Sequence, residues 1–552
     1  MLSSSEHFAK FTWVIPLAFL CLYLFTLASH HNEAEDALEY AMSVSQGDPL
    51  KLFHPNHLLF ETFSFWFYKL MSLVFVDIDV ITSMQILQSL AGAWTLWICL
   101  AVMKLLGMGL FWRLFTTICI GSSYGFWAYS VEADTYILPT LFLMLAVHEL
   151  LKAMQGDWSY PRFVLMGIFL SLATLVYQQH VLCFLVFFVP LSFFWFTEKL
   201  RFSVVFSRLA AFYGVSALLV GGAYLSVAFL VPAATDASSL SEALLWSLGH
   251  GSKGTFVEFG ASSLLKSVVG LFKAIWGVNF LFGYESFINL SRTLFPSLTG
   301  FEETYMAATL SPLTKAVALV TLVVGLLSFS VCIARAVFRG TTFKRLSGSG
   351  YIVFALTFLV VYSVFNTVYF PENLEFWIAV VPVFFILIGF FLSRQDNTVT
   401  RLRPLFAIVS MGILVPNAIG SIIPQSSDTG DFWKDFTQYY IEETSGEDRI
   451  IVHCGYICST WLEWWSPSQV YHLDDIELAD LELVLSEVGS DSGRILVSSW
   501  ALNPPSTLVT QKWDVDPQLE EKKRHLLTEY SDNMSIVHDD SIQTIYQVIK
   551  SP

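Results

Sequence analysis

The chain has 552 residues, of which 55% are hydrophobic and only 14% are charged, and its formal net charge at pH 7 is −16. A soluble domain carries about 25% charged residues, so this composition excludes an ordinary soluble enzyme and indicates a protein with many membrane spans. The acidic balance argues against nucleic acid as a partner, because carboxylates repel phosphates.

Eleven apolar runs are each long enough to cross a lipid bilayer. No small-residue cleavage site follows the first run, so we interpret it as a retained span and not as a signal peptide. We therefore predict an all-α, polytopic transmembrane module over residues 1–424. The predicted spans are 11–29, 83–106, 110–129, 135–152, 163–178, 181–197, 209–231, 313–337, 351–369, 375–393 and 404–423.

Charged residues in the connections orient these spans. With the N-terminus inside, the inner side holds 15 of the 30 Lys and Arg residues but only 5 of the 46 Asp and Glu residues. The short outer loops at 130–134, 179–180 and 370–374 contain no Lys or Arg, as the positive-inside rule requires. We expect two long outer loops, 30–82 and 232–312, in a cell inner membrane or the endoplasmic reticulum, with the functional site on the non-cytoplasmic side.

Each long outer loop contains an apolar segment that we do not interpret as a span. These segments, 58–76 and 262–282, both contain charged residues, and counting either one as a span would invert every later loop. We predict that both are interfacial helices. Lys266 and Lys273 are seven residues apart and so share a helical face, where they could meet a lipid headgroup or a substrate phosphate. Extension of the two side chains toward the membrane surface is the alternative.

The first outer loop begins with a cluster of carboxylates. If it is helical, Asp36 and Glu39 share one face and repel each other, so helix stability does not explain the cluster. A solvated loop is the alternative to a functional site. The same loop carries His54 and His57 in a His-Pro-Asn-His sequence. The clustered acids are Glu33, Glu35, Asp36 and Glu39.

Further polar residues stand at later outer turns. Glu132, Asp134 and Tyr136 lie between the third and fourth spans, His180 lies in the next outer turn, and Glu372 follows the span 351–369. A carboxylate at a membrane boundary is costly to desolvate, so it usually faces water, a cation or a substrate cavity. We expect these turns to line one cavity if the helices form a bundle. For His180, a hydrogen-bonded structural histidine is the alternative.

The sequence becomes more polar in residues 425–552, where helical and strand-like patterns alternate. This alternation predicts a small extracytoplasmic α/β domain. These residues contain no glycine-rich phosphate loop. Cys454 and Cys458 could form a disulfide in an oxidising compartment or remain thiols. The tryptophans near Trp461 could stack on a sugar or contact the membrane. The predicted helices are 431–444, 476–488 and 517–530, and the predicted strands are 449–453, 494–498 and 542–549.

Together these features resemble the GT-C membrane glycosyltransferases, with the protein O-mannosyltransferase-like branch as the most similar. In architecture the resemblance covers about residues 10–425. In that branch an Asp-x-x-Glu element precedes a His-Pro-Pro-Gly run, whereas here Asn56 and His57 stand in place of Pro-Gly. The motifs that carry the resemblance are Asp36-Ala-Leu-Glu39, His54-Pro55, Phe126 to Tyr136, Gln178-Gln179-His180 and Pro371 to Trp377.

The resemblance implies transfer of a sugar, expected to be a hexose, from a polyprenyl-phosphate donor to a glycan, lipid or protein acceptor on the outer face. A carboxylate would act as general base, and Asp36 is our first choice before Glu39. The phosphate leaving group needs positive charge. Asp36 and Asp134 are candidates for holding a divalent cation, Mg²⁺ or Mn²⁺. The expected substrate-binding residues are Glu33, His54, His57, Glu132, Asp134, Tyr136, His180, Lys266, Lys273 and Glu372.

A transporter or flippase for lipids or solutes is the alternative function. Transporters place ionisable groups or broken helices near the bilayer midplane. Here the charged residues stand at the ends of the predicted spans, and the spans between them are nearly free of charge. We therefore prefer the glycosyltransferase.

Overall fold

The computed structural model divides the chain into two compact units. The first unit contains Met1–Ala28, Tyr40–Val278 and Pro312–Ser426, and the second contains Ser29–Glu39, Asn279–Ser311 and Ser427–Pro552. The second unit thus combines the tail with one segment from each long outer loop. The structure describes residues 12–34, 36–231, 235, 238–249, 256–295, 300–338, 350–394, 403–454, 456–473, 476–486, 493–502, 518–530, 533–540 and 542–549.

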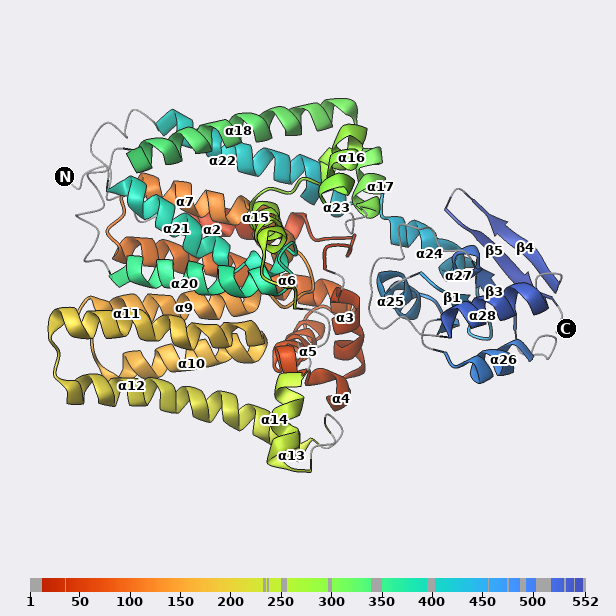
Figure 1. Cartoon of the computed structure of the whole chain (residues 1–552), viewed down its shortest axis with the longest axis horizontal. Helices are drawn as coiled ribbons and strands as arrows, with labels where there is room; N and C mark the ends of the chain where they lie inside the picture. The colour runs from red at the N-terminus through yellow and green to blue at the C-terminus, as the bar shows by residue number, and fades with distance from the viewer. Residues whose placement is uncertain are drawn as a thin grey trace. The chain divides into compact units, whose positions relative to one another are not determined.

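The first unit is built from helices (Figure 1), and each of the eleven predicted spans has a helical counterpart in it. Among the described residues, seven helical runs are long and apolar enough to cross a membrane, and α2, α7, α10 and α21 are shorter apolar helices. The polytopic all-α prediction is confirmed, while the number of spans stays a prediction. The helices are α2 (Val14–Phe25), α6 (Val80–Leu105), α7 (Leu110–Ser122), α8 (Tyr124–Ser130), α9 (Ile137–Met154), α10 (Tyr160–Val176), α11 (Leu182–Glu198), α12 (Phe202–Ser216), α13 (Gly222–Leu230), α18 (Pro312–Phe338), α20 (Gly350–Val368), α21 (Val380–Ser393), α22 (Arg403–Asn417) and α23 (Ile423–Gln425).

Shorter helices connect the spans. The two predicted interfacial helices are present as α5 and α15, each shorter than the apolar segment that contains it. One face of α15 buries the small residues Ser263, Ser267 and Gly270, while Leu264 and Val268 are exposed. Such an amphipathic helix suits a membrane surface, and its depth in the membrane stays a prediction. These connecting elements are α3 (Ala37–Gln46), α4 (Pro49–Leu52), η1 (Pro55–His57), α5 (Phe60–Ser72), η2 (Gln178–Val181), α14 (Leu240–Gly249), α15 (Ala261–Ile275) and η5 (Glu375–Trp377).

Helices α18 and α22 lie side by side (Figure 1) and approach closely at two glycines. A Cβ atom built on Gly412 would lie 2.3 Å from the Cα atom of Gly325, and a Cβ on Gly325 would lie 2.6 Å from the Cα atom of Gly412. The exposed face of α18 carries Val320 and Leu327, at 61% and 64% exposure. Apolar side chains thus face outward, while backbone packs against backbone between the helices, as is common in membranes.

Gly412→Ala should therefore destabilise the first unit, because the added methyl group meets backbone that cannot rotate away. We expect a cost of about 1–3 kcal/mol, typical of overpacking, seen as a lower midpoint in thermal unfolding of the detergent-solubilised protein. Gly222→Ala on α13 is the matched control, since no atom lies within 4 Å of the Cβ position there. Equal midpoints for the two variants would refute the close contact.

The tail of the second unit forms a five-stranded mixed sheet in the order β2-β1-β3-β5-β4. Strands β2, β1 and β3 are parallel, and β5 is antiparallel to both β3 and β4. The predicted α/β domain is present, but the sequence prediction missed β2 and β4. The strands are β1 (Arg449–Val452), β2 (Gln469–His472), β3 (Ile495–Ser498), β4 (Met534–Asp539) and β5 (Thr544–Val548); the helices of this unit include η4 (Asn279–Gly283), α16 (Glu285–Leu294), α17 (Phe301–Thr309), α24 (Phe432–Glu443), α25 (Tyr456–Trp465), α26 (Leu478–Ser486), α27 (Ser499–Leu502) and α28 (Leu519–His525).

The core of the tail follows the two-residue period of the strands. Ile451 of β1 and Val497 of β3 pack with Leu481 and Leu485 of α26 and with Leu519 of α28. Cys454 and Cys458, which the sequence left as either thiols or a disulfide, form a disulfide at the start of α25. The disulfide ties the end of β1 to the first turn of that helix.

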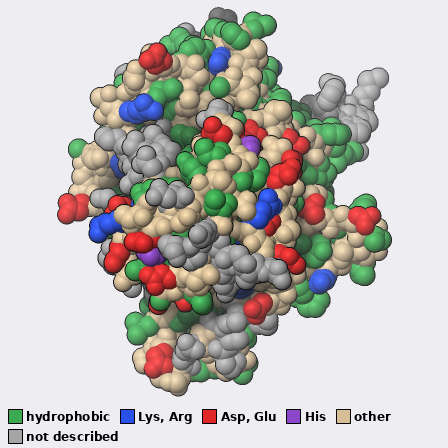
Figure 2. Space-filling view, turned by 90° about the vertical axis from the view of Figure 1, so that its right-hand side faces the viewer, with side chains coloured by type: hydrophobic (Ala, Val, Ile, Leu, Met, Phe, Trp, Pro, Cys, Tyr) green, Lys and Arg blue, Asp and Glu red, His purple; other side chains and the backbone are tan. Residues whose placement is uncertain are grey.

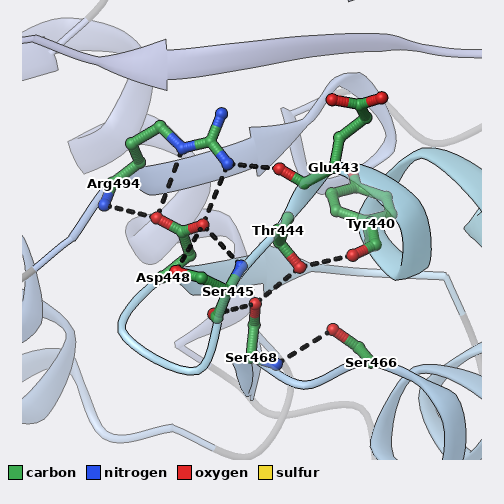
Figure 3. Close-up of polar contacts among 8 residues, drawn as sticks. All are labelled: Tyr440, Glu443, Thr444, Ser445, Asp448, Ser466, Ser468 and Arg494. Atoms are coloured by element: carbon green, nitrogen blue, oxygen red, sulfur yellow. Dashed lines mark hydrogen bonds and ion pairs between the residues drawn. The ribbon is translucent and has the colours of Figure 1, made fainter.

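A polar network joins the end of α24 to the starts of β1 and β3 (Figure 3). Arg494 donates its backbone N–H to Asp448 Oδ1 at 2.7 Å and its Nη2 to Asp448 Oδ2 at 2.9 Å. Arg494 Nη2 also donates to the carbonyl of Glu443, and the Ser445 N–H donates to Asp448 at 2.8 Å. Burial alone would raise the pKa of Asp448, but the hydrogen bonds from Arg494 and Ser445 outweigh it and lower the pKa to about 2. The carboxylate is therefore ionised at neutral pH.

The tail accounts for most of the net charge of the protein, about −15 of −16. Residues 425–552 hold 23 Asp and Glu residues but eight Lys and Arg residues. Figure 2 shows Asp and Glu side chains spread over the face that it presents. Such a surface favours water and disfavours anionic partners.

Candidate functional site

The predicted site residues fall into two sets, one in each unit. Glu33, Asp36 and Glu39 belong to the second unit, and all the others belong to the first. Glu35 lies outside the described residues.

Glu132 and Asp134 lie between α8 and α9 and are 3% and 2% exposed. The backbone N–H of Thr135 donates to the Asp134 carboxylate. Helix α6 holds both ends of this turn, because Ser89 donates to the carbonyl of Ser130 at 2.8 Å and Gln88 Oε1 accepts from the N–H of Leu138 at 3.1 Å. Buried carboxylates are rare in proteins, so this turn differs from an ordinary solvated loop. Acidic groups in such positions are candidates for a functional site.

Aromatic rings connect this turn to the other outer turns of the first unit. The ring of Tyr136 lies 5.2 Å from that of Tyr129 and 4.9 Å from that of Tyr177, measured between centroids. Tyr129 Oη donates to Glu375 Oε2 at 3.2 Å, and Asn373 donates to Glu375 Oε1 at 2.8 Å. Three turns that we predict to be on the outer side therefore meet around Tyr136, while the cavity itself stays a prediction.

Sequence reasoning did not select Glu375, Tyr129 or Tyr177 as site residues. Glu375 stands in the same Pro-Glu-Asn-Leu-Glu sequence as Glu372, and this second carboxylate was the signal available. Nothing in the sequence distinguishes Tyr129 and Tyr177 from other tyrosines, because their proximity to Tyr136 arises from three separate segments.

His180 is 1% exposed, and its Nδ1 lies 2.7 Å from the hydroxyl of Tyr362 on α20. The same hydroxyl lies 3.1 Å from the sulfur of Cys183. This environment is that of a hydrogen-bonded structural histidine, the alternative that the sequence left open. A role for His180 at a phosphate stays a prediction.

Lys266 of α15 forms an ion pair with Glu372, with 2.7 Å between Nζ and Oε1 and with 24% exposure of each side chain. Helix α15 approaches this loop closely, since a Cβ on Gly270 would lie 2.3 Å from the carbonyl oxygen of Pro371. Lys273 is partly buried further along the same helix. Two predicted substrate-binding residues, Lys266 and Glu372, are thus in direct contact.

His54 and His57 stack on each other, with 4.3 Å between ring centroids. His57 Nδ1 lies 2.9 Å from Glu61 Oε2, and both of these side chains are buried. Tyr224 donates to the carbonyl of Pro55 at 2.6 Å, which fixes the His-Pro element to α13. The His-Pro element is therefore held at Pro55 by Tyr224, and the Glu61 carboxylate lies beside His57.

In the second unit, the acidic loop is more accessible than the carboxylates between α8 and α9. Glu33 Oε1 accepts from Asn279 Nδ2 at 3.4 Å. Asp36 is partly exposed directly before the first residue of α3, and Glu39 is exposed in the first turn of that helix. Carboxylates at a helix N-terminus are stabilised by the helix dipole, which offsets their mutual repulsion.

No group of three or more His, Cys, Asp and Glu side chains among the described residues has the arrangement of a metal site. Asp36 and Asp134, the two candidate ligands, lie in different units. Neither set of described residues thus provides a metal site by itself, and a divalent cation stays a prediction.

The fold was compared with solved structures. ArnT from Cupriavidus metallidurans, bound to undecaprenyl phosphate, is similar over 98% of this chain and 98% of its own, with a TM-score of 0.57 and 12% identity. The apo oligosaccharyltransferase of Archaeoglobus fulgidus is similar over 97% of this chain and 80% of its own, with a TM-score of 0.52 and 12% identity. The chain has the GT-C fold.

The GT-C fold predicted from the outer-turn motifs is thereby confirmed, whereas the branch is not decided. The S. cerevisiae protein O-mannosyltransferase Pmt1-Pmt2 complex, bound to the sugar donor, matches 43% of this chain and 35% of its own, with a TM-score of 0.32 and 14% identity. No protein-family model matches the sequence, and no curated protein is similar to it. The GT-C fold is therefore recognised from its architecture.

Proposed function

We propose that this protein is an integral-membrane glycosyltransferase that moves a sugar from a polyprenyl-phosphate donor to an acceptor on the outer face. The observation that carries the proposal is the likeness over 98% of both chains to ArnT, a protein bound to undecaprenyl phosphate. The buried carboxylates Glu132 and Asp134 support it, because they place two acidic groups inside the first unit, at a turn that we predict to be on the outer side.

In the proposed reaction, an acceptor hydroxyl attacks the anomeric carbon of the donor sugar. A new C–O bond forms as the bond to the phosphate oxygen breaks, and Asp36 takes the hydroxyl proton. The accessibility of Asp36 supports this role, since a general base has to reach its substrate. Glu39 is the second choice. Glu33, Glu132 and Asp134 would orient the acceptor hydroxyls.

Positive charge would stabilise the departing polyprenyl phosphate. Lys266 is our candidate because its ion pair with Glu372 is partly exposed, so a phosphate can replace the carboxylate at Nζ. Lys273 on the same helix and His180 are further candidates. His54, His57 and Tyr136 would line the sugar site.

The test is transfer of radiolabelled sugar by purified protein. The sugar is supplied either on polyprenyl phosphate or on a nucleotide, with a mixture of glycan, lipid and protein acceptors. We expect transfer from the lipid-linked donor alone, with hexoses preferred. Transfer from the nucleotide donor alone would refute the proposal, and transfer from neither would favour a transporter or flippase. Addition of EDTA, followed by Mg²⁺ or Mn²⁺, tests for a divalent cofactor in the same assay.

The proposal places the tail on the non-cytoplasmic side, in a cell inner membrane or the endoplasmic reticulum. The disulfide between Cys454 and Cys458 supports this side, since disulfides persist in oxidising compartments. In a Cys21→Ser background, a cysteine at the exposed position of Glu442 should react with an impermeant thiol reagent in sealed cells. A cysteine at the exposed position of Arg201 should react only after permeabilisation. The reverse pattern would overturn both the topology and the function.

A further inference from the structure

The acidic loop packs with the tail, although the two are far apart in the sequence. Residues Ser29–Glu39 belong to the same compact unit as Ser427–Pro552. The loop contains little structure of its own between the end of α2 at Phe25 and the start of α3 at Ala37. Its local backbone hydrogen bonds include Ala34 N–H to the His31 carbonyl at 3.1 Å and Ala37 N–H to the Ala34 carbonyl at 2.9 Å.

The first contact with the tail is polar. Ser29 Oγ donates to Asp428 Oδ1 at 2.6 Å, and Lys434 Nζ lies 2.8 Å from the same oxygen. The hydrogen bonds from Lys434 and Ser29 favour the ionised form of Asp428, so its pKa lies below the usual value. One carboxylate thus links the start of the loop to the start of α24.

The second contact is buried. His30 and His31 are 1% and 5% exposed, and the ring of His31 lies 6.1 Å from that of Trp461 on α25. Asp431 is fully buried and accepts the N–H groups of Trp433 and Lys434 at 3.1 and 3.2 Å. Burial raises the pKa of Asp431 to about 6, although these hydrogen bonds and the neighbouring His31 act to lower it. The carboxylate of Asp431 therefore caps α24 beside the loop. The disulfide holds the first turn of α25, so the surface that His31 contacts is itself fixed.

The same end of α24 is anchored on its other side. Tyr305 of α17 donates to Asp435 at 2.6 Å, and the Trp433 indole donates to Glu302. The rings of Phe301 and Phe432 lie 4.2 Å apart. Because α24 is held by α17 and by the core of the tail, it is a firm support for the much less structured acidic loop.

We propose that the turn before α24 and the first turn of that helix form a clamp that positions the acidic loop for sugar transfer. The clamp consists of Asp428, Asp431 and Lys434 of the tail, acting on Ser29 and His31. Asp428 and Lys434 are positioning residues: they hold the loop and act on the reaction through Asp36. This inference rests on the proposed function and adds that the tail takes part in catalysis by fixing the proposed base.

The test uses the full-length protein with a charge exchange. Asp428→Lys and Lys434→Asp each place like charges together, whereas the double variant restores an ion pair and lets the amine introduced at position 428 donate to Ser29 Oγ. Asp540→Asn is the matched control, because Asp540 also pairs with a neighbour, His538, at 2.8 Å and accepts N–H groups of the tail, but in the turn between β4 and β5. Two quantities are measured: hydrogen exchange of the peptide covering residues 29–39, and kcat and KM for the donor.

We expect each single variant to speed exchange of this peptide by roughly two- to fivefold, as the loss of an exposed ion pair predicts. We expect kcat to fall by at least a similar factor while KM for the donor changes little, because the base is displaced and the donor site is not. The double variant should recover both quantities, and Asp540→Asn should leave both unchanged. Continued protection of residues 449–452 in β1 shows that the tail remains folded.

Normal exchange and turnover in both single variants would refute the clamp, as would a double variant that remains as impaired as the single ones. The exchange measurement does not depend on activity. If the exchange pattern is as expected but the wild-type protein transfers no sugar from any donor, the proposed function fails and the clamp on the loop stands.

Discussion

Asp36→Asn is expected to reduce sugar transfer by about 10²–10⁴-fold while the protein stays folded, because an amide cannot accept the proton of the acceptor hydroxyl. The position makes this substitution informative. Asp36 directly precedes the first residue of α3, where Asn and Asp are about equally favourable for the helix. The measurement is kcat for transfer from the lipid-linked donor, together with the thermal unfolding midpoint.

Two companion variants distinguish the proposed role of Asp36 as general base from its effect on the stability of the start of α3. Asp36→Ala removes both functions, so it should lose turnover and also lower the unfolding midpoint, by about 1 kcal/mol of stability. Glu39→Gln should be mild, because Glu39 is exposed in the first turn of α3. If Asp36→Asn turns over at a near wild-type rate while Glu39→Gln or Glu33→Gln does not, the base is Glu39 or Glu33, and our ranking of the carboxylates is wrong.

Asp134→Asn is expected to reduce turnover by about 10²–10³-fold, the range found when one preorganised polar group at a reaction centre is removed. Asp134 is 2% exposed and accepts the Thr135 N–H. Asn has nearly the same shape, and its amide oxygen can still accept this N–H. We therefore expect a nearly unchanged unfolding midpoint alongside the lost turnover.

Lost turnover at an unchanged unfolding midpoint is the diagnostic result for Asp134. It indicates a residue that is needed for function and not for the stability of the fold. A fall in turnover that is matched by a fall in the unfolding midpoint would instead assign Asp134 a structural role in the turn between α8 and α9.

The helices were predictable because a membrane span requires a long apolar run, which can be recognised without any knowledge of packing. The strands of the tail were harder to predict. Strand β2 has the sequence Gln469-Val-Tyr-His472 and is partly exposed at the sheet edge, so it shows no apolar alternation. Strand β4, at the other edge, is interrupted by an irregular register near His538. Edge strands bury less surface and therefore leave a weaker pattern.

The candidate site was predictable only in its charged members. Asp134 and Glu372 stood out because a carboxylate at a membrane boundary is costly to desolvate. The partners that surround them were not predictable: Tyr129 meets Glu375 across 246 residues of sequence. Likewise, periodicity cannot reveal that Asp428 holds Ser29, since the pair is 399 residues apart and each residue stands in an irregular segment.

The composition of the second unit from three separate segments has a consequence for biosynthesis. Its first segment ends at Glu39 and its last begins at Ser427, so roughly 400 residues must be synthesised before the two can meet. At about 5–20 residues per second, the interval is roughly 20–80 seconds. Throughout that time the acidic segment lacks its contacts with the tail, while the apolar helices up to α23 are synthesised. A ribosome that stops near residue 425 would release a chain in which Ser29 and His31 have no Asp428 or Trp461 to contact.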